Sequence, residues 1–278
     1  MKRIFSILFI YGLFVINITH AQTDSTNENK PQLKLSVNYN SNLNYYGRTD
    51  SLRSSGVFPM AELWITPKFY INAAPIFVTN KIAKMEYAGT VTTAGFQTVS
   101  DKWISNLYFL KPFYKESSQL VQSALKAQSG VSLTYLNKVM NLTAGGDVKF
   151  SDQTDFGATA GLDHIIRIQN SDNSVWVLDP SAYAYAGTQR FTNTYVKKKK
   201  GLLFLPGNEQ QVTENVQQFN MLAYEFSMPI IYTKGKLQFT ATPSYILPQN
   251  LMVASQRSST AEKGENMFYA TVGVKYSF

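Results

Sequence analysis

Apolar and polar residues alternate along successive segments of this chain, and this period-two pattern constrains the fold more than any other feature. Residues 33–40 (LKLSVNYN) and 268–278 (FYATVGVKYSF) show it most clearly. Such alternation is typical of β-strands that have one apolar and one polar face. Beyond the N-terminal segment no run of about 18 consecutive apolar residues occurs, so the sequence predicts no transmembrane helix.

The N-terminus has the features of an export signal. Lys2 and Arg3 precede an apolar run over residues 4–18, and Thr19-His20-Ala21 ends in a small residue. This pattern predicts a signal peptide over residues 1–21, cleaved after Ala21. The alternative, a membrane anchor, would need about 20 apolar residues. We expect residues 22–31 to form a flexible periplasmic lead and residues 32–278 to form the folded domain.

A soluble β-sandwich would show the same alternation, but three features favour a barrel in a membrane. The chain is predicted to be exported, its strands are long, and their polar faces are rich in Asn, Thr, Ser, Gln and Tyr, as in a barrel lumen. Charged residues make up only 16% of the chain, against about a quarter in soluble domains. In lipid every backbone polar group needs a partner, so the sheet must close. The sequence therefore predicts an all-β fold, a closed antiparallel transmembrane β-barrel.

Strand counting gives about twelve strands. They cover residues 33–46, 55–66, 68–80, 86–99, 102–112, 129–136, 139–150, 156–168, 174–187, 216–233, 236–246 and 266–278. Because 86–99 alternates poorly, ten or fourteen strands remain open. An even number places both chain ends in the periplasm. The short turns then lie on the periplasmic side, and the long segments 113–128, 188–215 and 247–265 lie outside.

The C-terminal strand resembles a known element. Its outward positions are Phe268, Ala270, Val272, Val274, Tyr276 and the terminal Phe278. This strand is similar to the C-terminal targeting strand of bacterial outer-membrane β-barrels, and residues 145–164 (GGDVKFSDQTDFGATAGLDH) are similar in style to Bacteroidota proteins of that class. The resemblance implies insertion by the barrel assembly machinery into the outer membrane of a Gram-negative bacterium, among lipid and lipopolysaccharide.

Catalytic chemistry has little support in the sequence. The chain has no cysteine, which excludes a thiol nucleophile and a cysteine-ligated metal. His164 is the one histidine left after signal cleavage, and no serine follows it at the spacing that barrel hydrolases use. Asp152 and Asp155 have no histidine nearby, and Gly145-Gly146 lies in a strand without a following helix, so no phosphate loop forms. We expect no enzyme, catalytic residue, cofactor or metal, with a barrel hydrolase as a remote alternative.

The formal net charge of +8 is concentrated in one loop. Lys197, Lys198, Lys199 and Lys200 are consecutive within segment 188–215. We interpret this basic loop as a solvated surface or as a contact with lipopolysaccharide phosphates or acidic glycans, and expect no nucleic-acid partner.

Projecting the alternation inward places charges in the lumen. Asp163, Asp179 and Glu225 fall on three consecutive predicted strands, with Arg167 and Lys236 as the expected basic partners. Inward charges either pair across a narrow lumen or form a cation-attracting constriction or a small polar ligand site, and the sequence leaves these alternatives open.

A pore for small polar solutes is the function that these features favour. The alternative is a non-conducting structural or accessory subunit that binds an outer-membrane partner through loops 188–215 and 247–265. The apolar run 201–206 (GLLFLP) within the first of these loops motivates this alternative, because such a run needs a surface to cover it.

Overall fold

The computed structural model describes residues 30–49, 52–82, 84–115, 125–151, 153–171, 173–198, 209–249 and 265–278. The predicted signal peptide and nearly all of the predicted periplasmic lead lie outside these residues. Within them the fold is all-β, and no helix is long and apolar enough to cross a bilayer.

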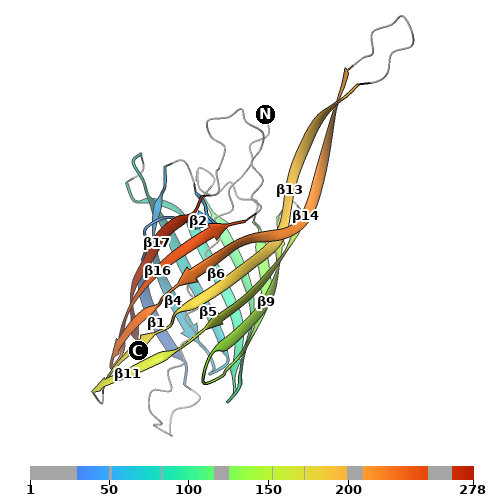
Figure 1. Cartoon of the computed structure of the whole chain (residues 1–278). Helices are drawn as coiled ribbons and strands as arrows, with labels where there is room; N and C mark the ends of the chain where they lie inside the picture. The colour runs from blue at the N-terminus through green and yellow to red at the C-terminus, as the bar shows by residue number, and fades with distance from the viewer. Residues whose placement is uncertain are drawn as a thin grey trace, which may run out of the picture.

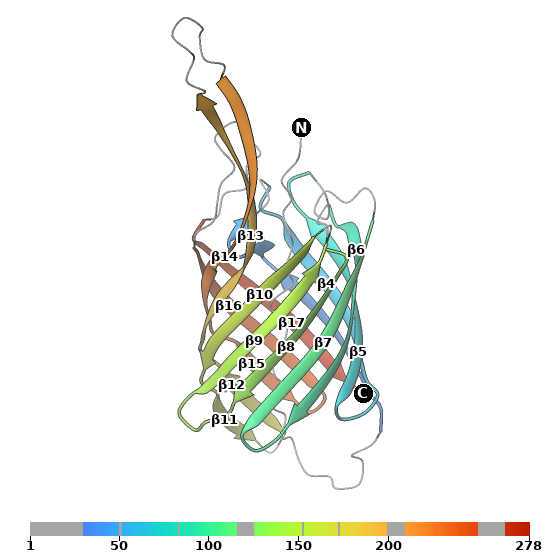
Figure 2. The same ribbon diagram turned by 90° about the vertical axis from the view of Figure 1, so that its right-hand side faces the viewer.

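A single antiparallel sheet closes on itself to form the barrel (Figures 1 and 2). Each strand pairs with its neighbours in chain order, and the last strand pairs with both its predecessor and the first strand. The ring consists of β1 (Gln32–Asn40), β4 (Ser55–Trp64), β5 (Phe69–Thr79), β6 (Glu86–Val99), β7 (Trp103–Tyr114), β8 (Ala127–Tyr135), β9 (Asn141–Phe150), β10 (Thr154–Asp163), β13 (Ser181–Lys198), β14 (Glu209–Ser227), β16 (Leu237–Pro248) and β17 (Met267–Ser277).

Three further strands are continuations of ring strands. β11 (Ile166–Ser171), β12 (Ser174–Leu178) and β15 (Ile230–Lys234) extend β10, β13 and β14 toward one end of the barrel in unbroken register. Two of the breaks contain a proline, Pro180 or Pro229. Because proline has no N–H to donate to the ladder, it interrupts the strand at that point. Their carbonyls still accept bonds from His164 N (3.1 Å) and Asp179 N (3.0 Å). The wall therefore has twelve strands, and the predicted fold class is confirmed.

Residues 86–99, whose apolar and polar alternation is the poorest of the predicted strands, form β6 as predicted. The structure corrects two other predicted element boundaries. The first strand ends at Asn40 instead of residue 46, because Asn40 Oδ1 accepts a bond from Asn42 N (2.9 Å) and turns the chain. A small hairpin, β2 (Asn44–Tyr45) and β3 (Arg48–Thr49), follows.

The second correction concerns the segment predicted as a loop over 188–215. Much of it continues as β13 and β14, paired up to Lys198 and Glu209, and the ribbon projects beyond the barrel rim (Figure 2). The β-branched and aromatic residues of 191–196 (FTNTYV) favour strand over loop.

Short turns connect the strands at one end of the barrel, and the longest connections lie at the other end. The turns that follow β4, β6, β8, β11 and β15 are short and lie at the end that also holds Gln32 and Phe278, here called the turn end. The longest connections lie at the opposite end, here called the loop end. This distribution matches the one predicted from the alternation.

The outer face is apolar and carries aromatic pairs near the turn end. Large exposed side chains include Leu107, Val131, Phe156, Leu162, Val272 and Val274. Ring pairs Trp103–Tyr135 (4.9 Å), Trp176–Tyr232 (4.7 Å) and Tyr276–Phe278 (4.8 Å between centroids) lie where the strands reach this end. An apolar band edged by aromatic residues is the surface that a bilayer requires of a barrel.

We predict that deletion of Phe278 lowers the yield of folded barrel. Phe278 N donates to Leu33 O (2.9 Å), which is the hydrogen bond nearest the turn end between the C-terminal strand and β1. The matched control is Phe156→Ala, which removes another outward phenylalanine from within β10, near the loop end. Heat-modifiable gel migration of outer-membrane fractions measures the folded fraction. Equal yields for the two variants would contradict a special role of the terminal residue.

Candidate functional site

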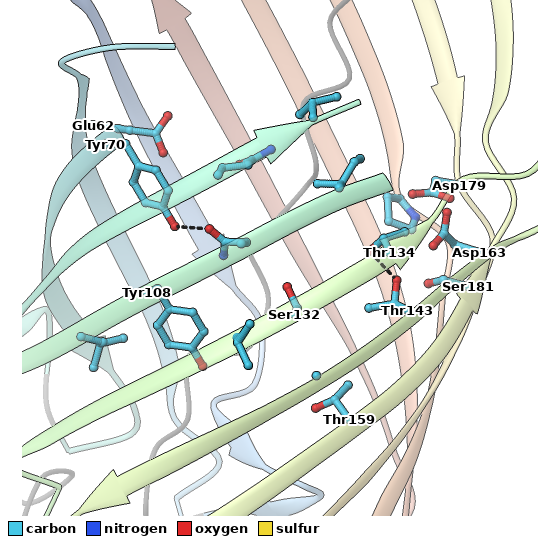
Figure 3. Close-up of a pocket in the computed structure, with 18 of the residues that line it drawn as sticks. Glu62, Tyr70, Tyr108, Ser132, Thr134, Thr143, Thr159, Asp163, Asp179 and Ser181 are labelled. Atoms are coloured by element: carbon cyan, nitrogen blue, oxygen red, sulfur yellow. Dashed lines mark hydrogen bonds between the residues drawn. The ribbon is translucent and has the colours of Figure 1, made fainter. Parts of the chain in front are cut away.

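A cavity of about 810 Å³ occupies the barrel interior (Figure 3). Its wall consists of the inward positions of the strands, where tyrosine, serine, threonine and amide side chains predominate. About eight strands only fill their own interior with side chains, whereas twelve leave room for a solute.

One row of polar side chains crosses six neighbouring strands of the wall. Directly paired residues along it, from β17 to β9, are Tyr269, Ser244, Ser227, Ser181, Asp163 and Asn141. The Ser181 and Ser227 hydroxyls are 2.7 Å apart, and Asn141 Nδ2 donates to Asp163 Oδ2 (2.7 Å). Tyr269 lies at the loop end of β17 and Asn141 at the turn end of β9, so the row descends along the cavity because the strands are tilted.

Asp163 and Asp179 are neighbours on this wall. Asp179 precedes Ser181 by two residues, so it lies on the same face, and its carboxyl group lies beside that of Asp163 (Figure 3). Within the described part of the chain, Asp179 Oδ1 is buried and has no hydrogen-bond partner. Both residues line the cavity near its turn end.

Glu225 lines the same cavity but stands apart from the two aspartates. It is paired with Tyr183, two residues nearer the loop end than the row of Asp163, and the tilt of the strands raises it further. Glu225 Oε1 accepts a bond from the Tyr269 hydroxyl (2.8 Å). The structure therefore places the three predicted acids on one wall at two different depths.

The two predicted basic partners lie toward the turn-end rim. Lys236 is exposed in the turn between β15 and β16, away from the acids. Arg167 is exposed on β11, paired with Val177, four residues beyond Asp163. Neither is among the described residues that line the cavity.

A different lysine lies inside the barrel, on the wall opposite the aspartates. Lys34 Nζ is 3.8 Å from Glu62 Oε1 and 4.9 Å from the centre of the Trp64 ring, and Trp64 Nε1 donates to Glu62 (2.8 Å). β1 and β4 are half a turn of the ring away from β10 and β13. The turn-end half of the barrel interior thus has Glu62 with Lys34 and the nearby Lys275 on one side and two acids on the other.

Inward tyrosines lie flat against the wall because the neighbouring strand carries glycine. A Cβ atom on Gly161 would overlap the ring of Tyr183, and one on Gly95 would overlap Tyr70. Tyr70 also donates to Asn106 Oδ1 (3.2 Å). The sequence analysis missed these pairs because a cross-strand neighbour is visible only once the register is known.

Two apolar clusters border the cavity toward the loop end. Both include a residue of the segment that follows β1, here called the inward segment (residues 41–49 and 52–54). Leu43 packs among Phe58, Ile76, Val78, Ala88 and Val91, with Leu110 against them. Tyr46 packs among Tyr185, Leu222, Ala223, Ile246, Met267 and Tyr269. Leu110, Tyr185 and Tyr269 also line the cavity, so the clusters lie directly on it.

The inward segment also has a polar side. Tyr45 is half-buried near Arg48, Asp147, Lys149 and Asp155, and desolvation of its hydroxyl raises the pKa of this group, so the phenol stays neutral. Lys149 Nζ and Asp147 Oδ1 form a buried ion pair of 2.9 Å on β9. These charges meet the hairpin at the loop end and not in the cavity.

The other predicted residues lie outside the cavity, with the exception of Phe278. Along β17, Phe268, Val272, Val274 and Tyr276 are exposed on the outer face and Ala270 is half-buried, whereas the terminal Phe278 is exposed at the turn end, where it also borders the cavity. Lys197 and Lys198 end β13, whereas Lys199 and Lys200 lie outside the described residues. His164 is exposed on the outer face of the break after β10. The described residues contain no group of three or more His, Asp or Glu side chains that could hold a metal.

Comparisons with known proteins return matches only among solved structures. No family model and no curated protein matches the chain. The KdgM porin matches with 7% identity and a TM-score of 0.48, over 88% of this chain and 99% of its own. The NanC porin matches with 10% identity and a TM-score of 0.43, over 88% and 98%. LpxR from Salmonella typhimurium matches with 7% identity and a TM-score of 0.40, over 87% and 99%. These values are too low to indicate an activity.

We predict that Gly161→Ala destabilises the barrel or displaces the Tyr183 ring into the cavity. Overpacking of this kind costs about 1–3 kcal/mol. Gly146→Ala is the matched control, since its Cβ would make only an ordinary 3.5 Å contact with Gly157 O. Urea unfolding in detergent measures the change in the free energy of unfolding for both. Equal values, with the cavity unchanged, would show that the ring does not need the glycine.

Proposed function

We propose that this barrel is a pore for small polar solutes in the outer membrane of a Gram-negative bacterium of Bacteroidota type. The observation that carries this proposal is the polar 810 Å³ cavity inside a closed ring of twelve strands. The apolar outer face supports a position in a membrane, and the polar inner face supports passage of a hydrated solute.

The proposed orientation places the turn end in the periplasm and the loop end outside the cell. An even strand number brings both ends of the barrel to the turn end, which is the arrangement of bacterial single-chain barrels. Export by the predicted signal peptide and insertion through the C-terminal strand by the assembly machinery belong to the same proposal.

The cavity is proposed to favour cations. Its described lining residues include the acids Glu62, Asp163, Asp179 and Glu225 but only the bases Lys30 and Lys34. Lys34 is already paired with Glu62, whereas Asp163 and Glu225 accept hydrogen bonds from the neutral groups of Asn141 and Tyr269. Uncompensated carboxylates inside a low-dielectric wall raise the local concentration of cations.

We predict that neutralising the three lumen acids reduces cation selectivity. The variant is Asp163→Asn, Asp179→Asn and Glu225→Gln together, and Asp101→Asn in an exposed turn is the control. The reversal potential across a planar bilayer in a salt gradient measures the selectivity. It should move toward zero in the triple variant and stay unchanged in the control. An unchanged potential in a conducting triple variant would contradict the proposal.

A second candidate function is an accessory subunit that binds an outer-membrane partner. The ribbon of β13 and β14 supports it, because beyond Thr188 and Leu222 these strands pair only with each other among the residues that the structure describes, so both outer edges have no strand partner there. Open strand edges are surfaces for another chain. Segments 188–215 and 247–265 would provide the contact, and Lys197 to Lys200 would face lipopolysaccharide or an acidic partner.

We predict that shortening the ribbon by removing residues 190–216 leaves conductance intact. Under the accessory-subunit alternative, the same deletion would abolish co-purification of one defined outer-membrane protein from native membranes. Loss of that protein together with a non-conducting wild-type barrel would favour the alternative over the pore.

The barrel is also proposed to have no catalytic activity. His164 faces outward, whereas the cavity serines lie on the inner face. A general base must reach its nucleophile by hydrogen bonding, and opposite faces of one wall do not allow this.

A further inference from the structure

We propose that the inward segment is a gate that holds the pore closed at the loop end and opens when its contacts with Glu265 are released. This inference rests on the proposed pore function. It concerns a segment that no sequence pattern had set apart from the first strand.

The gate is held over the cavity by two apolar anchors. Leu43 and Tyr46 are each only 6% exposed, although both belong to a connection between strands. The Tyr46 ring is 5.2 Å from the ring of Tyr185, which lines the cavity. Each anchor enters one of the two apolar clusters, so the segment bridges opposite parts of the wall.

One residue fastens the outer side of the segment. Glu265 N donates to Gly47 O (3.0 Å), and Glu265 Oε1 lies 2.6 Å from Arg53 Nη2. Gly47 has φ of +80° and lies directly on Pro248, where a Cβ would overlap the proline ring. Glu265 therefore contacts both the tip and the returning arm of the segment.

This fastening is suited to reversible release. The Arg53 and Glu265 side chains are 66% and 44% exposed, so solvent and salt compete with their pairing. The start of the segment is held on β17, since Ser41 N donates to Ala270 O (2.9 Å), and the bond from Leu43 N to Ser54 O (2.7 Å) joins the two arms of the segment to each other. A loop with its ends held together and its tip fastened at the surface can move as one unit.

Movement of the segment would connect the cavity with the loop end. Lys149 and Asp147 form their ion pair within β9, so this pair stays on the wall when the segment moves away. Loss of Leu43 and Tyr46 from their clusters would remove the apolar cover from Leu110 and Tyr185 at the top of the cavity.

Charge reversal tests the fastening without disturbing the core. Arg53→Glu and Glu265→Arg should each raise the open probability in planar bilayers by about 1.5- to 5-fold, the range expected for an exposed ion pair. The double variant should return it toward the wild-type value. The control is Lys81→Glu, which reverses another exposed loop-end charge. Single variants that behave like the control would overturn the role of Glu265.

Removal of the anchors tests the closure itself. Leu43→Ser with Tyr46→Ser should raise the open probability by more than about tenfold, because two buried apolar side chains are lost from the closed state only. The control is Ile82→Ser, a loop-end residue that is 77% exposed. Heat-modifiable migration checks that each variant folds. If wild type and the anchor variant are equally open, the gate is overturned.

A second measurement does not depend on conductance. Since the chain has no cysteine, Ser132→Cys places a single thiol on the cavity wall (Figure 3). In intact cells, a membrane-impermeant maleimide should label it at least about tenfold faster in the anchor variant than in the wild-type background. Equal labelling rates overturn the gate. Faster labelling in a barrel that never conducts supports the gate and instead contradicts the proposed pore.

Discussion

The pairing of β17 with β1 is the constraint on which the rest of the structure depends. A barrel wall in lipid cannot leave a strand edge unpaired, because each orphaned backbone group would cost several kcal/mol. Residues 34–40 pair with 271–277, so the two ends of the folded chain meet along a full strand. Closure also fixes strand tilt, and the tilt determines which inward side chains share a depth in the cavity.

The alternation predicted the fold and the facing of most side chains, since a strand shows two faces whatever its neighbours are. It did not predict depth. Asp163, Asp179 and Glu225 all line the cavity, but the register sets Glu225 beside Tyr183 and Tyr269, away from the two aspartates. Lys236 lies at an inward position of the alternation, but the structure places it in the turn between β15 and β16. The alternation does not show where a strand ends.

The alternation also could not predict that the inward segment leaves the first strand. Residues 42–45 (NLNY) continue the polar and apolar alternation of β1, but side-chain hydrogen bonds of Asn40 and Asn44 turn the chain away from the strand. Leu43 and Tyr46 therefore pack in the two apolar clusters as parts of the inward segment and not as residues of a wall strand. Local hydrogen bonds from asparagine compete with strand pairing at such positions, and alternation cannot detect this competition.

The glycine positions opposite the inward tyrosines have a consequence for how steady the passage is. A side chain that stands free in a channel changes rotamer and narrows or widens it from moment to moment. Tyr70, Tyr108 and Tyr183 lie over Gly95, Gly130 and Gly161, in notches that the missing Cβ atoms leave in the backbone. Rings recessed in this way line the cavity from fixed positions against the backbone, so the bore of the barrel is set by sheet geometry and is as constant as the sheet.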